Sequence, residues 1–123
     1  MITYKFDQDK DILLVNYEGL ITDYDVINYI SDVGIKTKSL KKLKIFEDAR
    51  NGEISPDVVD VDKIVETLRQ FSNNYKKVII ATLQDKPVET ALNILFQKTL
   101  NLENYHYKVF STKKSALEWL SNF

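Results

Sequence analysis

The sequence predicts an α/β fold: a mixed, mostly parallel five-stranded sheet with an N-terminal antiparallel hairpin and four helices, in the order β-β-α-β-α-β-α-β-α. Short apolar runs alternate along the chain with segments whose apolar residues recur at helical spacing, which is typical of helices packed on parallel strands. The clearest unit is residues 77–97, where the apolar run Val78–Ala81 stops at a polar turn and Pro87 opens a helix.

The first two strands predict a hairpin. Ile2, Tyr4 and Phe6 alternate with polar residues, which indicates a half-buried strand. The polar stretch Asp7–Asp11 is a short connection to a second strand, Ile12–Tyr17. A connection this short allows antiparallel pairing only. The half-polar first strand is expected at an edge of the sheet.

The first helix is expected to begin after Thr22, its N-cap, with Asp25 completing a capping box. Gly34 is the expected C-cap. The third strand is expected to end at Glu47-Asp48 and to be followed by a loop, Ala49–Ile54.

Ser55-Pro56 predicts the start of the second helix, because serine is a favoured N-cap and proline a favoured first helical residue. The fourth strand is apolar on both faces and is expected inside the sheet. The third helix is expected to bury one apolar stripe, consisting of Val88, Ala91, Leu92, Leu95, Phe96 and Thr99. After a fifth strand, Tyr105–Phe110, a short last helix should dock on the sheet through Leu117, Trp119 or Leu120, since a helix this short is unstable alone.

Composition limits the function classes. A chain of 123 residues, 44% of them hydrophobic, is expected to form one domain with a core. A net charge of −1 argues against nucleic acid as a partner. There is no cysteine, so disulfides and cysteine nucleophiles are excluded. Without an apolar run near the roughly 20 residues of a membrane span, a cytoplasmic protein with no membrane insertion is expected.

The chain resembles the SpoIIAA-like superfamily, the group that contains STAS and CRAL-TRIO (Sec14-type) domains. The resemblance covers nearly the whole chain. It rests on the hairpin, the segment IFEDARN, the apolar fourth strand with its proline-started helix, and the closing pattern VFSTKKSALEWL. It implies that residues 1–123 form one STAS-like domain of the kind found in small bacterial proteins.

The resemblance also implies a function. It indicates a non-enzymatic regulatory or protein-interaction domain with a protein partner, and a homodimer is an option. The alternative is a domain that binds a small apolar, lipid-like ligand. In anti-sigma-factor antagonists a phosphorylatable serine follows an aspartate in a pattern like D-S-S-G. Asp48 matches that aspartate, but Ala49 and Arg50 follow it, and Ser55 is better interpreted as a helix cap.

No motif predicts a catalytic, cofactor or metal site. His106 is the single histidine, and the sequence names no group that would position it as a base. Three glycines cannot make a phosphate loop. A receiver domain is a further alternative, which Asp48 and Thr82 fit loosely, but the acidic pair that would hold Mg²⁺ is missing after the second strand. No metal, no cofactor and no enzymatic activity are therefore expected.

The working surface is expected at the carboxyl ends of the parallel strands, where open α/β sheets bind ligands. Arg50 is prominent there, because its planar fork suits carboxylates and phosphates; an internal ion pair with Asp48 or Glu47 is the alternative. The seven tyrosines either form an exposed interface or cap the core with their hydroxyls in water. The candidate binding residues are Asp48, Arg50, Asn51, Ser55, Thr82, Asp85 and Lys86.

Overall fold

A computed structural model describes residues 1–54 and 60–123 of the chain. Its elements follow the predicted order: β1 (Ile2–Asp7), β2 (Ile12–Ile21), α1 (Asp23–Lys36), β3 (Lys42–Ile54), α2 (Val61–Ser72), β4 (Lys77–Leu83), α3 (Pro87–Thr99), β5 (Tyr105–Phe110) and α4 (Lys113–Ser121). The strands form one sheet in the order β1-β2-β3-β4-β5. The strand β1 is antiparallel to β2 and the other pairs are parallel, so the predicted fold class is confirmed.

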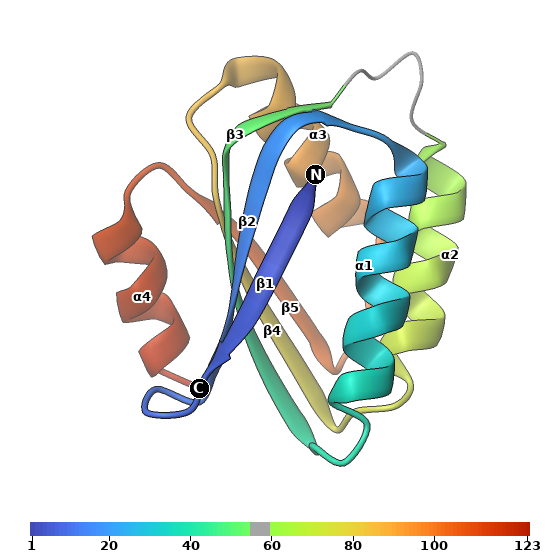
Figure 1. Cartoon of the computed structure of the whole chain (residues 1–123), viewed down its shortest axis with the longest axis vertical. Helices are drawn as coiled ribbons and strands as arrows, with labels where there is room; N and C mark the ends of the chain where they lie inside the picture. The colour runs from blue at the N-terminus through green and yellow to red at the C-terminus, as the bar shows by residue number, and fades with distance from the viewer. Residues whose placement is uncertain (55–59) are drawn as a thin grey trace.

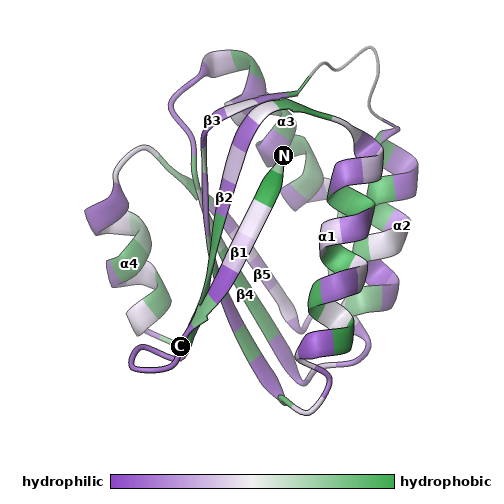
Figure 2. Cartoon of the chain, viewed as in Figure 1, coloured by the Kyte–Doolittle hydropathy of each residue, from purple (hydrophilic) through white to green (hydrophobic). Residues whose placement is uncertain are grey.

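The sheet separates two apolar cores. The helices α1, α2 and α3 cover one face and α4 covers the other (Figure 1). In Figure 2 hydrophobic and hydrophilic residues alternate around α1, α2 and α4, as expected for helices with one side on a sheet. The strand β4 lies inside the sheet, and Val78 to Leu83 are all buried, as predicted. On the α4 face Ala116 and Leu120 are completely buried, so the last helix docks as expected.

The order of the strands excludes the receiver alternative. Receiver domains have the doubly wound order 2-1-3-4-5, in which the first strand lies inside the sheet. Here β1 is an edge strand, and it pairs antiparallel with β2. Within the described part of the chain, no helix combines the length and the hydropathy needed to cross a membrane.

The first helix begins as predicted and ends later. Thr22 accepts from the backbone N–H of Asp25, whose side chain accepts from the backbone N–H of Thr22, so the capping box is present. The prediction that Gly34 ends the helix is wrong, because α1 continues to Lys36 with Thr37 as its C-cap. The carbonyl of Val33 accepts from both the backbone N–H of Thr37 at 2.9 Å and the Thr37 hydroxyl at 2.7 Å, which fixes this C-cap.

The predicted loop Ala49–Ile54 is wrong: β3 continues as a strand to Ile54. The reason is pairing with β2, which itself extends to Ile21, and Gly19 lies opposite Gly52 in this extension. A Cβ on Gly52 would lie 2.9 Å from the Cβ of Tyr17, so glycine allows the two strands to pair beside the tyrosine. The polar composition of this stretch resembles a turn, but the ladder with β2 satisfies its backbone.

The second and third helices also differ from expectation. The helix α2 begins at Val61 with Asp60 as its N-cap, later than the predicted start; Ser55 and Pro56 lie outside the described residues. The prediction that Pro87 opens α3 is confirmed. The predicted buried stripe is wrong for Val88, Ala91, Leu95 and Thr99, which are exposed, whereas Leu92, Asn93 and Phe96 are buried. The helix turns its polar Asn93 inward because the Asn93 amide finds a partner there, the Tyr107 hydroxyl.

Candidate functional site

The predicted polar residues at the carboxyl ends of the strands are largely bound to one another. Arg50 forms a bidentate ion pair with Asp48: its Nε donates to Oδ1 at 3.0 Å and its Nη2 donates to Oδ2 at 2.8 Å. These hydrogen bonds from Arg50 hold the pKa of the Asp48 carboxyl below its usual value and raise the pKa of the guanidinium. Of the two alternatives for Arg50, the structure has the internal ion pair with Asp48. This pair uses two of the three guanidinium nitrogens of Arg50.

Hydrogen bonds hold the turn after β4 against the end of β3. Gln84 is buried; its Nε2 donates to the carbonyl of Ala49 at 3.0 Å, and its Oε1 accepts from the backbone N–H groups of Asp85 and Lys86. The Lys86 ammonium donates to the carbonyl of Gly52 at 2.9 Å. These bonds hold residues 84–86 against β3 and leave the Asp85 side chain exposed at the surface.

The other three candidate binding residues are Asn51, Thr82 and Ser55. Asn51 is exposed on β3 near this turn. Thr82 does not reach the surface, because it is 1% exposed and faces the interior between the sheet and α1 to α3. Ser55 lies outside the described residues. His106 is remote from all of them and packs its ring against Phe123, with ring centroids 5.1 Å apart.

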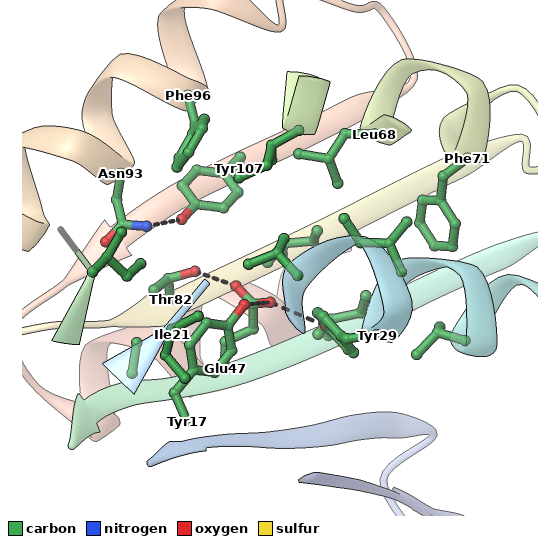
Figure 3. Close-up of a pocket in the computed structure, with 18 of the residues that line it drawn as sticks. Tyr17, Ile21, Tyr29, Glu47, Leu68, Phe71, Thr82, Asn93, Phe96 and Tyr107 are labelled. Atoms are coloured by element: carbon green, nitrogen blue, oxygen red, sulfur yellow. Dashed lines mark hydrogen bonds between the residues drawn. The ribbon is translucent and has the colours of Figure 1, made fainter. Parts of the chain in front are cut away.

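The sheet also buries a carboxyl group that the sequence did not single out. The alternation of β3 turns Ile45, Glu47 and Ala49 toward α1 to α3, and Glu47 is only 6% exposed. The Thr82 hydroxyl donates to Glu47 Oε1 at 2.7 Å. The hydroxyls of Tyr17 and Tyr29 both donate to Oε2 at 3.0 Å (Figure 3). We call these four residues, Glu47, Thr82, Tyr17 and Tyr29, the Glu47 cluster.

Glu47 is a buried carboxyl group whose hydrogen-bond partners among the described residues are all neutral hydroxyl groups. Burial raises the pKa of Glu47, and the hydrogen bonds from Thr82, Tyr29 and Tyr17 offset only part of that effect. Burial, together with the nearby Glu47 charge, raises the pKa of the Tyr17 and Tyr29 hydroxyls well above the usual value. No lysine or arginine in residues 1–54 and 60–123 forms an ion pair with Glu47.

A cavity of about 60 Å³ lies beside the Glu47 cluster, between the sheet and the helices α1, α2 and α3. Most of its wall is apolar, from side chains such as Ile30, Leu68 and Phe96. Asn93 on α3 and Tyr107 on β5 contribute polar atoms, and the Asn93 amide donates to the Tyr107 hydroxyl at 2.8 Å (Figure 3). Asn93 Oδ1 is buried and has no hydrogen-bond partner among the described residues.

The volume of this cavity argues against the lipid-like alternative. For comparison, an apolar cavity of about 150 Å³ can hold one benzene molecule. At about 60 Å³ the present cavity is smaller than that and has no room for an acyl chain.

Two signals in the sequence could have indicated this site. Glu47 follows Ile45 at the period-two spacing that marks one face of a strand, so it belongs to the core face. Thr82 follows the apolar Val78 and Ile80 at the same spacing. Neither expectation for the tyrosines describes Tyr17 and Tyr29, whose hydroxyls are buried and bonded to a carboxyl group.

Two solved structures share this fold. An uncharacterized protein of the DUF3478 family with a SpoIIAA-like fold, from Shewanella loihica PV-4, is 16% identical, with a TM-score of 0.65 over 98% of this chain and 92% of that chain. The anti-sigma factor antagonist SpoIIAA in its unphosphorylated form is 7% identical, with a TM-score of 0.55 over the whole of both chains. The fold of the present chain is therefore SpoIIAA-like. No family model and no curated protein matches the chain.

Proposed function

We propose that residues 1–123 act as one STAS-like domain, a non-enzymatic cytoplasmic regulator that works by binding another protein. The observation that carries the proposal is the outer side of α3. Val88 and Leu95 are 57% and 48% exposed, although large apolar side chains are normally covered. Val88 and Leu95 line a shallow apolar hollow together with Pro87, Ala91 and Leu92.

An exposed apolar helix face is a common docking surface for a protein partner. The residues at this hollow follow one another at helical spacing, so a single groove or helix of a partner could contact all of them. Asp85 and Lys86 lie next to the first residue of α3, and Asn51 is exposed on β3. We therefore propose that a partner contacts the outer side of α3 and, at its N-terminal end, Asp85 and Lys86. Asp48 lies beside Lys113 and Leu117 on the α4 side of the sheet, so the Asp48–Arg50 pair is outside this surface.

The chemistry of the described residues supports a role without catalysis. They contain no group of three or more histidine, cysteine, aspartate or glutamate side chains that could hold a metal ion. The polar groups at the carboxyl ends of β3 and β4 are tied into internal bonds, as with Asp48, Arg50 and Gln84.

The proposal is tested by capturing partners from extracts of the source cell with immobilised chain. The test variant carries Val88→Lys and Leu95→Lys on α3. The matched control carries Tyr24→Lys and Ile35→Lys, which are both 69% exposed on α1. Circular dichroism first establishes that both variants are folded, and mass spectrometry then quantifies the captured proteins.

The proposal predicts a protein that the natural chain and the α1 variant both retain and the α3 variant loses. Sedimentation of the chain alone distinguishes the homodimer, since self-association abolished only by the α3 changes would make a second copy the partner. If every captured protein is retained equally by the α3 variant, the outer side of α3 is not the docking surface and the proposal fails.

A further inference from the structure

The cavity beside the Glu47 cluster is lined by acceptor groups and, among the described residues, by no lysine or arginine, and this combination points to a ligand. We propose that the cavity binds a small organic ammonium ion, with the Glu47 carboxylate and Asn93 Oδ1 as its acceptors. This site is independent of the protein-binding surface proposed above, because Glu47 and Asn93 are buried and the outer side of α3 is exposed.

The burial of Glu47 favours a cation beside it. A carboxylate removed from water is costly, and buried charges in proteins are usually paired with an opposite charge. Glu47 receives three hydrogen bonds, all from neutral hydroxyl groups, and no lysine or arginine of the described chain pairs with it. A cationic ligand in the neighbouring cavity would supply the positive charge that the chain itself does not provide.

The side-chain oxygen of Asn93 has no hydrogen-bond donor in the described part of the chain. The side chain is 8% exposed, and its Nδ2 is already committed to the Tyr107 hydroxyl. Its Oδ1 is left without a donor, although nearly all buried polar atoms in folded proteins have one. Asn93 lines the same cavity as Glu47, so one ligand that carries several N–H donors can serve both groups.

The donors of an ammonium group match the acceptors of the cavity. An ammonium group has three donors and no acceptor, whereas a carboxylate or phosphate ligand has only acceptors when ionised. An anionic ligand would face the negative charge of Glu47 and would leave Asn93 Oδ1 unsatisfied. The polar groups of the cavity therefore favour a cation over an anion.

Size and wall chemistry restrict the rest of the ligand. The cavity volume of about 60 Å³ is well below the roughly 150 Å³ of a cavity that holds benzene, so it favours a ligand smaller than an aromatic ring. The apolar wall, formed by side chains such as Ile30 and Phe96, suits a short alkyl group. The class is therefore a compact primary alkylammonium ion, and ordered water is the competing occupant.

The test is a titration of isotope-labelled chain with ethylammonium chloride, followed by nuclear magnetic resonance. Ethanol serves as the neutral probe of similar size, and sodium chloride controls for ionic strength. We expect saturable shifts of the Asn93 side-chain amide signals with ethylammonium and none with either control. Equal shifts with ethanol, or no saturable shift of these signals with ethylammonium, would overturn the proposal and leave water as the occupant.

Two variants sharpen the result. Glu47→Gln keeps the shape of the side chain and removes its charge, and Asn93→Leu removes the unpaired oxygen. Binding to both variants is followed through the backbone amide signal of Thr82, which lines the same cavity. Each should weaken ethylammonium binding by about tenfold or more, as expected for losing a charge-assisted or buried hydrogen bond. Ile79→Val is the control, because Ile79 is buried in the core on the α4 side of the sheet. Binding that survives Glu47→Gln unchanged would contradict the assignment; if that variant does not fold, Asn93→Leu decides by the same criterion.

Discussion

Glu47 and Thr82 lie opposite each other on the parallel strands β3 and β4, and the Thr82 hydroxyl donates to Glu47 Oε1 at 2.7 Å. On the same core face, Ile45 and Ile80 are paired in the preceding register position, so the polar pair interrupts an apolar ladder. Tyr17 on β2 and Tyr29 on α1 also donate hydrogen bonds to the Glu47 carboxyl group. One buried side chain therefore connects three strands and a helix.

Replacing Glu47 by glutamine should change how stability depends on pH. The folded chain raises the pKa of Glu47 above the ordinary value of 4.5, chiefly by burial. A carboxyl group with a raised folded pKa stabilises the fold fully below its unfolded pKa, and this contribution is lost as pH rises through the folded pKa. Glutamine cannot ionise and escapes this loss. The stability of Glu47→Gln relative to the natural chain should therefore increase between about pH 4 and about pH 7.

Urea unfolding of both chains at the two pH values measures this difference, and groups other than Glu47 cancel in the comparison. A stability difference that does not change with pH would mean that Glu47 has an ordinary pKa in the folded chain.

Two glycine substitutions should have opposite effects. A Cβ on Gly52 would lie 2.9 Å from the Cβ of Tyr17, and such overpacking costs roughly 1–3 kcal/mol. A Cβ on Gly34, inside α1, would lie 3.5 Å from Phe71 Cδ1, an ordinary contact. Gly34→Ala should stabilise the chain by up to about 1 kcal/mol through helix propensity. Denaturant midpoints test both, and a Gly52→Ala chain as stable as the natural one would show that β2 and β3 do not meet so closely.

The docking of α4 should depend on Leu120. This side chain is completely buried on the α4 face of the sheet. Leu120→Ala should destabilise the chain by roughly 2–5 kcal/mol, whereas Leu117→Ala, at a half-buried position, should cost less. Equal denaturant midpoints for the natural chain and Leu120→Ala would indicate that the helix is frayed in solution.

The two leucines of α3 should differ in their contribution to stability, because they lie on different faces of the helix. Leu92 is buried and Leu95 is 48% exposed. Leu92→Ala should therefore cost roughly 2–5 kcal/mol of stability, and Leu95→Ala should stay within about 0.5 kcal/mol of the natural chain. Thermal or urea unfolding measures both changes. A large loss of stability for Leu95→Ala would restore the single buried stripe that the sequence predicted and would remove the proposed docking surface.

Local patterns in the sequence were sufficient for most of the fold. The alternation around Tyr4 identifies a half-buried edge strand, and the continuous run from Val78 identifies an interior one. The capping box of Thr22 and the position of Pro87 depend only on near neighbours in the chain. Such features are predictable because their physical cause lies within a few residues.

The remaining features depend on distant residues. The strand β3 extends through Asn51 and Gly52 only because β2 pairs with it there. The partners of Glu47 lie 30, 18 and 35 residues away, at Tyr17, Tyr29 and Thr82. The inward side of α3 includes Asn93, whose partner Tyr107 lies 14 residues away on β5. No local pattern contains these contacts.

The most direct test of the proposed function is a map of backbone amide shifts in the labelled chain on addition of the captured partner. The account predicts perturbations along the outer side of α3, at residues such as Val88 and Leu95, and at the adjoining Asp85 and Lys86. Perturbations confined to the opposite end of the sheet, in the hairpin turn at residues 7–11 and the connection at residues 36–42, would contradict it.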